Sequence, residues 1–319
     1  MTVSPAPFFL DCDTGIDDAL ALGYLLASDT ATLVGVGSVS GNVSAAVGAR
    51  NTLDLLALAG HAGIPVAVGA EHPQAGTFDG GVPHIHGDNG VGNFELHTSR
   101  EQPIDGTAAE LLVRLARQYA GELRLIAIGP LTNIAEALRL EPGLPALIKD
   151  FTLMGGAAMA PGNITPVAEA NIWNDPEAAA EVFAADWMIT MVPLDVTMTS
   201  VFEESDRTAL LDSGRPMPTA LGHILDLYYE FYVGTYGRRA SALHDPLAVA
   251  VALGDARIAS APVVRVVVDA TQGPGRGQTI CDMRGAINGF PPQEGAHCRV
   301  VLALDEDFAP ALLARLITL

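Results

Sequence analysis

Short apolar runs alternate with longer helical patterns along most of this chain, and this alternation limits the possible folds more than any other feature. Strand-sized runs such as "PFFLD", "LRLIAIGP" and "MITMVPLD" stand between helical patterns such as "DDALALGYLLAS" and "GTAAELLVRLARQYA". Strands and helices that alternate in this way form βαβ units, with helices on both faces of a parallel sheet. We therefore predict an α/β protein with a doubly wound, mostly parallel central sheet.

The 319 residues carry no Ser/Gly/Pro linker, charge run or fixed-period repeat that would divide them. We expect a single domain over residues 1–319. Residues 71–103 form one long stretch rich in Gly, His and Pro, without helical or strand periodicity. Loops of this length in compact domains are usually functional, so we expect a lid or binding loop at about 71–103.

The charge of the chain limits its partners. There are 37 acidic and 17 basic residues, Lys149 is the single lysine, and the formal net charge is −20. Nucleic acid polymers and anionic membranes are held mainly through Lys and Arg, so this surface should repel both. Small neutral ligands and metal cations are the better matched partners.

The three cysteines Cys12, Cys281 and Cys298 show no CxxC pairing, and they are too few for a disulfide framework. We expect reduced thiols. The start of the chain, "MTVSPAPFFL", lacks the features of a signal peptide, and no apolar run reaches the length of a membrane span. A cytoplasmic location is the expectation that follows.

Polar residues recur where the expected strands end. The first strand leads to Asp11 and Asp13, the second to "SGN" with Asn42, and later strands to "GPLTN" and "MGG". In open α/β sheets, ligands bind at the carboxyl ends of the parallel strands. The pattern therefore predicts one site assembled from several distant segments.

Four aspartates crowd the segment "FFLDCDTGIDDAL": Asp11, Asp13, Asp17 and Asp18. One acid alone could simply complement the positive N-terminus of the following helix. Four together repel one another and raise their pKa values unless a cation neutralises them, and a hard divalent ion bound through oxygens does this best. The later segment "LHDPLAVA" repeats the arrangement with His244 and Asp245, although taken alone this pair could be a helix cap.

Two enzyme chemistries fit a strand that ends in "LDCDTG". The first is a phosphatase of the haloacid dehalogenase type, in which Asp11 would be the nucleophile, Asp13 the acid, and magnesium the cofactor. That chemistry also needs a later Lys or Arg for the phosphate and a further pair of acids. Lys149 stands before a strand, and the following "TLMGGAAMAPGN" has no acid pair.

The second chemistry is hydrolysis of an N-glycoside. Over nearly its whole length the chain resembles the inosine-uridine preferring nucleoside hydrolases. The matching stretches occur in family order: "LDCDTGIDDA", "SGN", "HGDNG", "GPLTNIA", "MGG", "GNITPVAEANIWNDPEAA" and "LHDPLAVA". Many members have proline where this chain has Thr14. The resemblance implies the nucleoside hydrolase fold, and cleavage of purine and/or pyrimidine ribonucleosides to free base and ribose.

The resemblance also implies a calcium site. Asp13, Asp18, Asp245 and the backbone carbonyl of Ile128 would bind Ca²⁺, and such mixed oxygen ligands are those that calcium prefers. Asp13 would act as general base on a metal-bound water, and the sugar would pass through an oxocarbenium-like transition state. Asp11 would orient its neighbours without touching the metal.

The substrate contacts implied by the resemblance surround this metal. Asp17 with Asn171 would bind the 2′- and 3′-hydroxyls, Asn163 with Glu169 the 5′-hydroxyl, and Asn42, Met154 and His86 would make further contacts. In isolation Asn163 could be a turn residue, Glu169 a surface acid, and Met154 a core residue. His86 is preferred over the nearby His84 because it heads the family motif.

His244 is the candidate that protonates or hydrogen-bonds the leaving base. Tyr232 and Tyr236 lie four apart on an expected helix, so both could stack on the base, and Arg238 could add a hydrogen bond. An aromatic stripe packed in the core would explain the tyrosines equally well. Stacking in any case does not discriminate purines from pyrimidines.

The resemblance further implies a homodimer or homotetramer. A protein of another class, a non-catalytic module that binds nucleosides or calcium, would also keep the cleft. The joint presence of Asp13 and His244 argues against it, because binding alone needs no paired base and acid.

Overall fold

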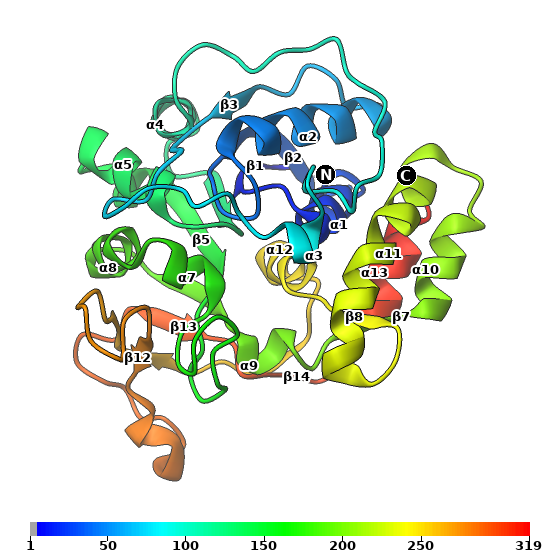
Figure 1. The fold of residues 1–319 in the computed structure, drawn as a ribbon. Helices are drawn as coiled ribbons and strands as arrows, with labels where there is room; N and C mark the ends of the chain where they lie inside the picture. The colour runs from blue at the N-terminus through cyan, green and yellow to red at the C-terminus, as the bar shows by residue number, and fades with distance from the viewer. Residues whose placement is uncertain (1–4) are drawn as a thin grey trace, which may run out of the picture.

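An eight-stranded sheet forms the centre of the molecule in the computed structural model, which describes residues 5–319 (Figure 1). The strand order is β10-β13-β6-β5-β4-β1-β2-β3, and all neighbours pair in parallel except β10 with β13. The strands are β1 (Ala6–Cys12), β2 (Ala31–Ser38), β3 (Val66–Val68), β4 (Leu123–Ala127), β5 (Ile148–Met154), β6 (Ile189–Val192), β10 (Val263–Val264) and β13 (Cys298–Val300). The predicted α/β class with a mostly parallel sheet is confirmed.

The side chains of β1 show why helices cover both faces of this sheet. Successive residues of a strand point to opposite faces. Phe8 and Leu10 accordingly enter one apolar core, while Phe9 between them enters the other. Because β1 is buried on both faces, its sequence is a continuous apolar run, and such a strand needs a helical layer on each side.

The longer helices are α1 (Ile16–Leu26), α2 (Ala45–Leu58), α4 (Ala108–Gln118), α5 (Thr132–Leu140), α8 (Pro176–Ala184), α10 (Glu204–Leu211), α11 (Pro216–Tyr236), α12 (Asp245–Leu253) and α13 (Ala309–Leu316). Helices α1, α2, α11, α12 and α13 contribute to the core that contains Phe8, and α4, α5 and α8 contribute to the core that contains Phe9. Short helices are α3 (Pro83–His86), α6 (Leu144–Leu147), α7 (Ala170–Asn174), α9 (Leu194–Thr197) and the 3₁₀ helix η1 (Met283–Asn288).

The strand order reverses next to β1. From β1 the chain builds β2 and β3 on one side, and then crosses to build β4, β5 and β6 on the other. At such a switch point the loops leave in opposite directions and open a crevice outside the carboxyl ends of the strands. Asp13 follows β1 and Ile128 follows β4, so both lie at this crevice.

Three two-stranded sheets complete the fold, formed by β7 (Val201–Glu203) with β8 (Ala240–Ala242), β9 (Ile258–Ser260) with β14 (Ala303–Leu304), and β11 (Val266–Val268) with β12 (Thr279–Cys281). Within residues 5–319, no helix has both the length and the apolar character needed to cross a membrane.

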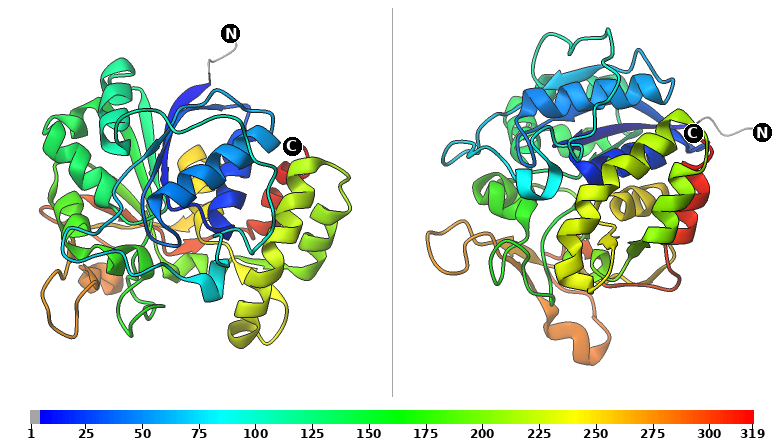
Figure 2. Two further views of the ribbon diagram at one scale, coloured as in Figure 1. Left: turned by 45° about the horizontal axis from the view of Figure 1, so that its top comes forward. Right: turned by 45° about the vertical axis from the view of Figure 1, so that its right-hand side comes forward.

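The segment 71–103 contains the short helix α3, which lies beside α11 in both views of Figure 2. The part of this segment from Val82 onward is tied to the body of the protein. The Val82 amide donates to the Asn42 carbonyl at 3.1 Å, and the Asn51 side chain donates to the Asn89 carbonyl at 2.8 Å. Residues 74–81 are largely exposed, and Gly76, Gly80 and Gly81 there adopt positive φ angles.

Candidate active site

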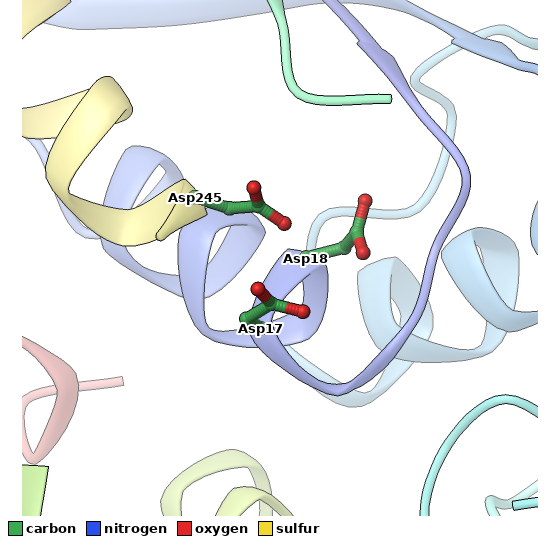
Figure 3. Close-up of side chains that lie close together, drawn as sticks. All are labelled: Asp17, Asp18 and Asp245. Carbon is green, nitrogen blue, oxygen red and sulfur yellow. The ribbon is translucent and has the colours of Figure 1, made fainter. Parts of the chain in front are cut away.

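Three buried aspartates face one another at the crevice. Asp17 and Asp18 lie in the first turn of α1, Asp245 begins α12, and these two helices pack together. One carboxylate oxygen from each residue lies within 4.8 Å of the other two (Figure 3). The site thus joins the start of the chain to a segment more than two hundred residues away.

Burial and like charge make this group unfavourable without a cation. Burial, followed by the neighbouring Asp18 charge, raises the pKa of Asp17 to about 7. The pKa values of Asp18 and Asp245 are also raised well above the ordinary value, first by burial and then by the surrounding carboxylates. A bound divalent cation would reverse these shifts, because it favours the ionised form of every ligand.

Asp13 lies against the same group. Its Oδ2 accepts a hydrogen bond from the Asn42 amide at 2.7 Å, while its Oδ1 is buried without a partner. Asp18 is similar: its Oδ2 accepts from the Gly15 amide at 2.8 Å, and its buried Oδ1 has no donor. Buried carboxylate oxygens without donors are costly unless a cation is present, so the donor set fits a hard divalent ion.

The close grouping differs in one member from the expected ligand set. It contains Asp17, whereas we expected Asp13 beside Asp18 and Asp245. Asp13 is nevertheless near enough for its charge to raise the pKa of both Asp18 and Asp245. The Ile128 carbonyl also lies at the site, where it accepts a hydrogen bond from the Asn171 side chain at 3.1 Å.

A cavity of about 420 Å³ opens above these acids. The predicted residues that line it are Asp17, Asn42, His86, Ile128, Met154, Asn163, Glu169, Asn171, Tyr232, His244 and Asp245. Asp13 and Asp18 are buried and are not part of its lining. Among the described residues that line the cavity there is no lysine or arginine, which disfavours a phosphate ligand.

The polar side chains on one side of the cavity are fixed by backbone donors. Glu169 caps α7, where it accepts hydrogen bonds from the amides of Gly156, Asn171 and Ile172. The Asn163 Oδ1 accepts from the Ala170 amide at 3.0 Å. The side chains at this wall are therefore ordered before any ligand binds.

Asp11 lies behind the site. Its Oδ1 accepts from the Asn133 side chain at 2.9 Å, and Asn133 in turn accepts from the Ala70 amide. Burial raises the pKa of Asp11 to about 8. Asp11 is absent from the cavity lining, a position that suits a support for the strand ends better than a nucleophile.

The opposite wall carries a histidine with two hydrogen bonds. His244 Nδ1 lies 2.8 Å from the Thr197 hydroxyl, and His244 Nε2 lies 2.7 Å from the Tyr232 hydroxyl. Burial lowers the pKa of His244 to about 4, so the ring is neutral near pH 7. The nearby Tyr228 hydroxyl donates to Asp17 at 3.1 Å.

Tyr236 and Arg238 are not brought to the cavity. The Tyr236 hydroxyl donates to the Met198 carbonyl at 3.0 Å, and the Arg238 guanidinium pairs with Glu203 on the surface. Tyr236 is the last residue of α11 and Arg238 follows the helix, so both lie past the part of α11 that faces the acids. Tyr232 is therefore the one of the two predicted tyrosines that reaches the site.

His86 anchors the segment 71–103 to the acid-bearing turn. Its Nδ1 accepts a hydrogen bond from the Ile16 amide at 3.0 Å, and its ring lies 5.4 Å from that of Tyr228. Burial lowers its pKa to about 3. His84 is exposed, lies against Phe231 and does not line the cavity, so the structure brings His86 and not His84 to the site.

Several residues at the site were missed by sequence reasoning, among them Asp79, Thr197, Tyr228 and Phe231. Tyr228 could have been found, because it stands four residues before Tyr232 on the same helical face. Thr197 gave no signal, since nothing in "LDVTMTS" distinguishes it from a core residue.

Gly15 leaves the space that the site needs, and this supports a first prediction. A Cβ at this position would lie 2.5 Å from His86 Nδ1 and 2.7 Å from Asn42 Nδ2. Gly15→Ala is therefore expected to lower the free energy of unfolding by about 1–3 kcal/mol through overpacking. Urea denaturation measures this change.

Gly234→Ala is the matched control, because a Cβ on this exposed helical glycine meets nothing within 4 Å. It is expected to leave stability unchanged or to add up to ~1 kcal/mol. A Gly15→Ala protein as stable as the Gly234→Ala protein would contradict the close approach of His86.

The chain is thus an α/β protein with a cluster of buried carboxylates that fits a divalent cation, next to a cavity that can hold a small molecule. Residues 8–309 match the family model of the inosine-uridine preferring nucleoside hydrolases. The chain therefore belongs to this family and is a hydrolase that acts on N-glycosyl compounds.

Individual relatives agree with this assignment. The chain is 33% identical over 308 residues to the inosine-uridine preferring nucleoside hydrolase of Leishmania major, covering 95% of this chain and 94% of that protein. It is 35% identical over 241 residues to the probable uridine nucleosidase 2 of Arabidopsis thaliana, covering 75% of each. The solved structure of the purine-preferring ribonucleoside hydrolase from Gardnerella vaginalis superposes with a TM-score of 0.88 at 32% identity, over 98% of this chain and 97% of that one. The phosphatase alternative is not favoured.

Proposed function

We propose that this protein hydrolyses the N-glycosidic bond of ribonucleosides in a calcium-dependent reaction. The observation that carries the proposal is the group of buried carboxylates directly below a polar cavity. Four buried acids in one place repel one another, and a bound cation is what would stabilise them. A cavity without lysine or arginine side chains suits a neutral nucleoside better than a phosphorylated one.

Asp13, Asp18, Asp245 and the Ile128 carbonyl would hold the calcium ion, with Asp17 at its edge. The donor set supports this choice, because the close group consists of carboxylates alone and contains no His or Cys ligand that zinc would prefer. When bound, such an ion supplies positive charge that lowers the pKa of water and orients hydroxyl groups.

Asp13 would take the proton of the attacking water. Its Oδ1 is buried without a donor, so this oxygen is free to accept a proton. The hydroxyl of the water ends on C1′ of the ribose, and the electron pair of the broken C–N bond stays on the base. The free base gains one proton, and the water loses one proton to Asp13, so the overall reaction consumes one water molecule and releases no net proton.

The remaining acids would bind and stabilise the ribose. Asp17 and Asn171 would bind the 2′- and 3′-hydroxyls, and Asn163 and Glu169 would bind the 5′-hydroxyl. Asn42 and Met154 would complete this wall. The negative charge around the ring would also favour the positive charge that develops on the sugar as the bond breaks.

The leaving base would lie against Tyr232 and His86. His244 Nε2 is already bonded to the Tyr232 hydroxyl, so His244 would act on the base through Tyr232. A hydrogen bond from the Tyr232 hydroxyl would stabilise the negative charge that accumulates on the departing base. The segment 71–103 would serve as a lid, and its largely exposed residues 75–81 would be the part that moves.

A panel of substrates tests the proposal. Purified protein with calcium is incubated with uridine, inosine, adenosine, cytidine and p-nitrophenyl phosphate, and release of ribose and phosphate is measured. Ribose release from at least one nucleoside is expected. Phosphate release without ribose would establish the phosphatase, and tight nucleoside binding without turnover of any substrate would establish a binding module. The names of the relatives mention uridine, inosine and purines, so the preferred base is left to this panel.

The family resemblance also leads us to propose a homodimer or homotetramer. Analytical ultracentrifugation checks this directly, and a monomer at micromolar concentration would contradict it.

Removal of the metal gives a second prediction. Without a cation the buried carboxylates repel one another, so a chelator should lower the melting temperature, and added calcium should restore it. At a calcium concentration far above Kd, binding stabilises by roughly 3 kcal/mol or more, which corresponds to a shift on the order of 5 °C or more. Differential scanning calorimetry with magnesium as comparison measures the shift, and identical melting in calcium and chelator would contradict the metal site.

A further inference from the structure

Thr197 is a fully buried polar residue whose hydroxyl forms a hydrogen bond with the His244 ring. It ends the short helix α9, it is 0% exposed, and its hydroxyl lies 2.8 Å from His244 Nδ1. Among the described residues, its Oγ1 has no other hydrogen-bond partner. The proton of this hydroxyl therefore has one available acceptor, the ring nitrogen.

The direction of this hydrogen bond fixes the protonation of the whole ring. If His244 Nδ1 carried the proton and donated it to Thr197, the buried Thr197 hydroxyl would be left without an acceptor. Buried donors in native proteins are almost always paired. Thr197 consequently donates to Nδ1, which leaves Nε2 as the His244 nitrogen that carries the proton.

The Nε2 proton in turn orients Tyr232. Nε2 donates to the Tyr232 oxygen at 2.7 Å, so the hydroxyl proton of Tyr232 is not used by His244. Tyr228, whose ring centre lies 5.0 Å from that of Tyr232, directs its own proton to Asp17. The Tyr232 proton is thus used by neither His244 nor Asp17. Tyr232 lines the cavity, so its hydroxyl can donate to a ligand there or to the neighbouring Tyr228 oxygen.

We infer that Thr197 is a positioning residue that holds His244 in its Nε2–H tautomer and so presents the Tyr232 hydroxyl as a hydrogen-bond donor to the leaving base. The opposite tautomer would reverse both hydrogen bonds of His244. Tyr232 would then donate to His244 and would offer only lone pairs to a base that is becoming negative. The inference rests on the proposed hydrolase reaction. It predicts that Thr197 matters only for substrates whose leaving group needs such a donor.

Three variants and two substrates test this role. Thr197→Val keeps the shape and removes the hydroxyl, Thr197→Ser restores it, and Thr199→Val is the control two residues away, where the hydroxyl donates to the Val196 carbonyl instead. Uridine or inosine, whichever the wild-type enzyme cleaves, is compared with p-nitrophenyl riboside, which has a good leaving group.

Thr197→Val is expected to lower kcat on the nucleoside by roughly tenfold to a hundredfold, a part of what a well-placed proton donor contributes, with less than about threefold loss on p-nitrophenyl riboside. Thr197→Ser should restore most of the nucleoside activity, and Thr199→Val should behave as wild type. Equal losses on both substrates, unchanged nucleoside turnover, or failure of serine to rescue would overturn the inference.

The tautomer can also be read directly in the wild-type protein, which keeps the inference testable if Thr197→Val does not fold. Nitrogen-15 NMR is expected to show a protonated Nε2 and an unprotonated Nδ1 for His244, assigned by the loss of its signals in His244→Asn. A protonated Nδ1 would overturn the inference. Wild-type protein that releases no ribose from any nucleoside would instead refute the proposed reaction, independently of the tautomer.

Discussion

Asp13→Ala is expected to lower kcat for nucleoside hydrolysis by on the order of a thousandfold or more at saturating calcium. The variant loses the group that takes the proton of water, a contribution of roughly 10²–10⁴, and it also loses one oxygen ligand of the cation. The buried Oδ1 of Asp13, which has no donor, is the atom that supports both roles.

Asp13→Asn separates the two effects, because it keeps the side-chain volume and one carbonyl oxygen but cannot act as a base. Its calcium affinity, measured by isothermal titration calorimetry, should be nearer to wild type than that of Asp13→Ala, while its kcat stays low. Asp29→Asn, on an exposed acid away from the site, should leave both quantities unchanged. A kcat within tenfold of wild type in either Asp13 variant would remove Asp13 as the base.

Asp245→Asn is expected to have opposite effects on activity and on stability. The Asp245 carboxylate has no hydrogen-bond partner among the described residues, and its pKa is raised well above the ordinary value by burial and by Asp17, Asp18 and Asp13. Removal of its charge should therefore raise the melting temperature in chelator, because the repulsion among the buried acids is relieved. Calcium affinity and kcat should both fall by at least about a hundredfold.

This combination distinguishes a metal ligand from a residue that merely supports the fold. Differential scanning calorimetry of Asp245→Asn should show a higher melting temperature without metal and a much smaller calcium-induced shift than wild type. A lower melting temperature in chelator, with a normal calcium shift, would place Asp245 outside the metal site.

The layers of the fold could be predicted because each depends on a local pattern. The continuous apolar run at Phe8–Leu10 indicated a strand buried on both faces, and the helical periods between such runs indicated the crossover helices. The antiparallel edge strand β10 has only two residues, Val263 and Val264, and too few residues to carry a periodic signal. The order of the strands depends on packing among distant segments, which no local pattern records.

In the candidate site, too, the residue types could be predicted from the sequence, but their arrangement could not. Asp17, Asp18 and Asp245 were recognisable by residue type, but only the packing of α1 against α12 decides which carboxylate oxygens approach one another. Tyr228, Tyr232 and Tyr236 share one helical face, and the sequence cannot tell which part of that face covers the cavity. Tyr228 and Tyr232 reach the site, whereas Tyr236 contacts Met198.

The dependence of ribose release on free calcium shows whether the buried carboxylates hold the ion that the reaction needs. Wild-type protein is stripped with chelator, and ribose release from a cleaved nucleoside is followed as calcium is added back. The rate should start near background, rise in proportion to the fraction of protein with bound calcium, and then saturate. Asp245→Asn should need a much higher calcium concentration to reach half of its maximal rate. Full ribose release in chelator, unchanged by added calcium, would contradict the account.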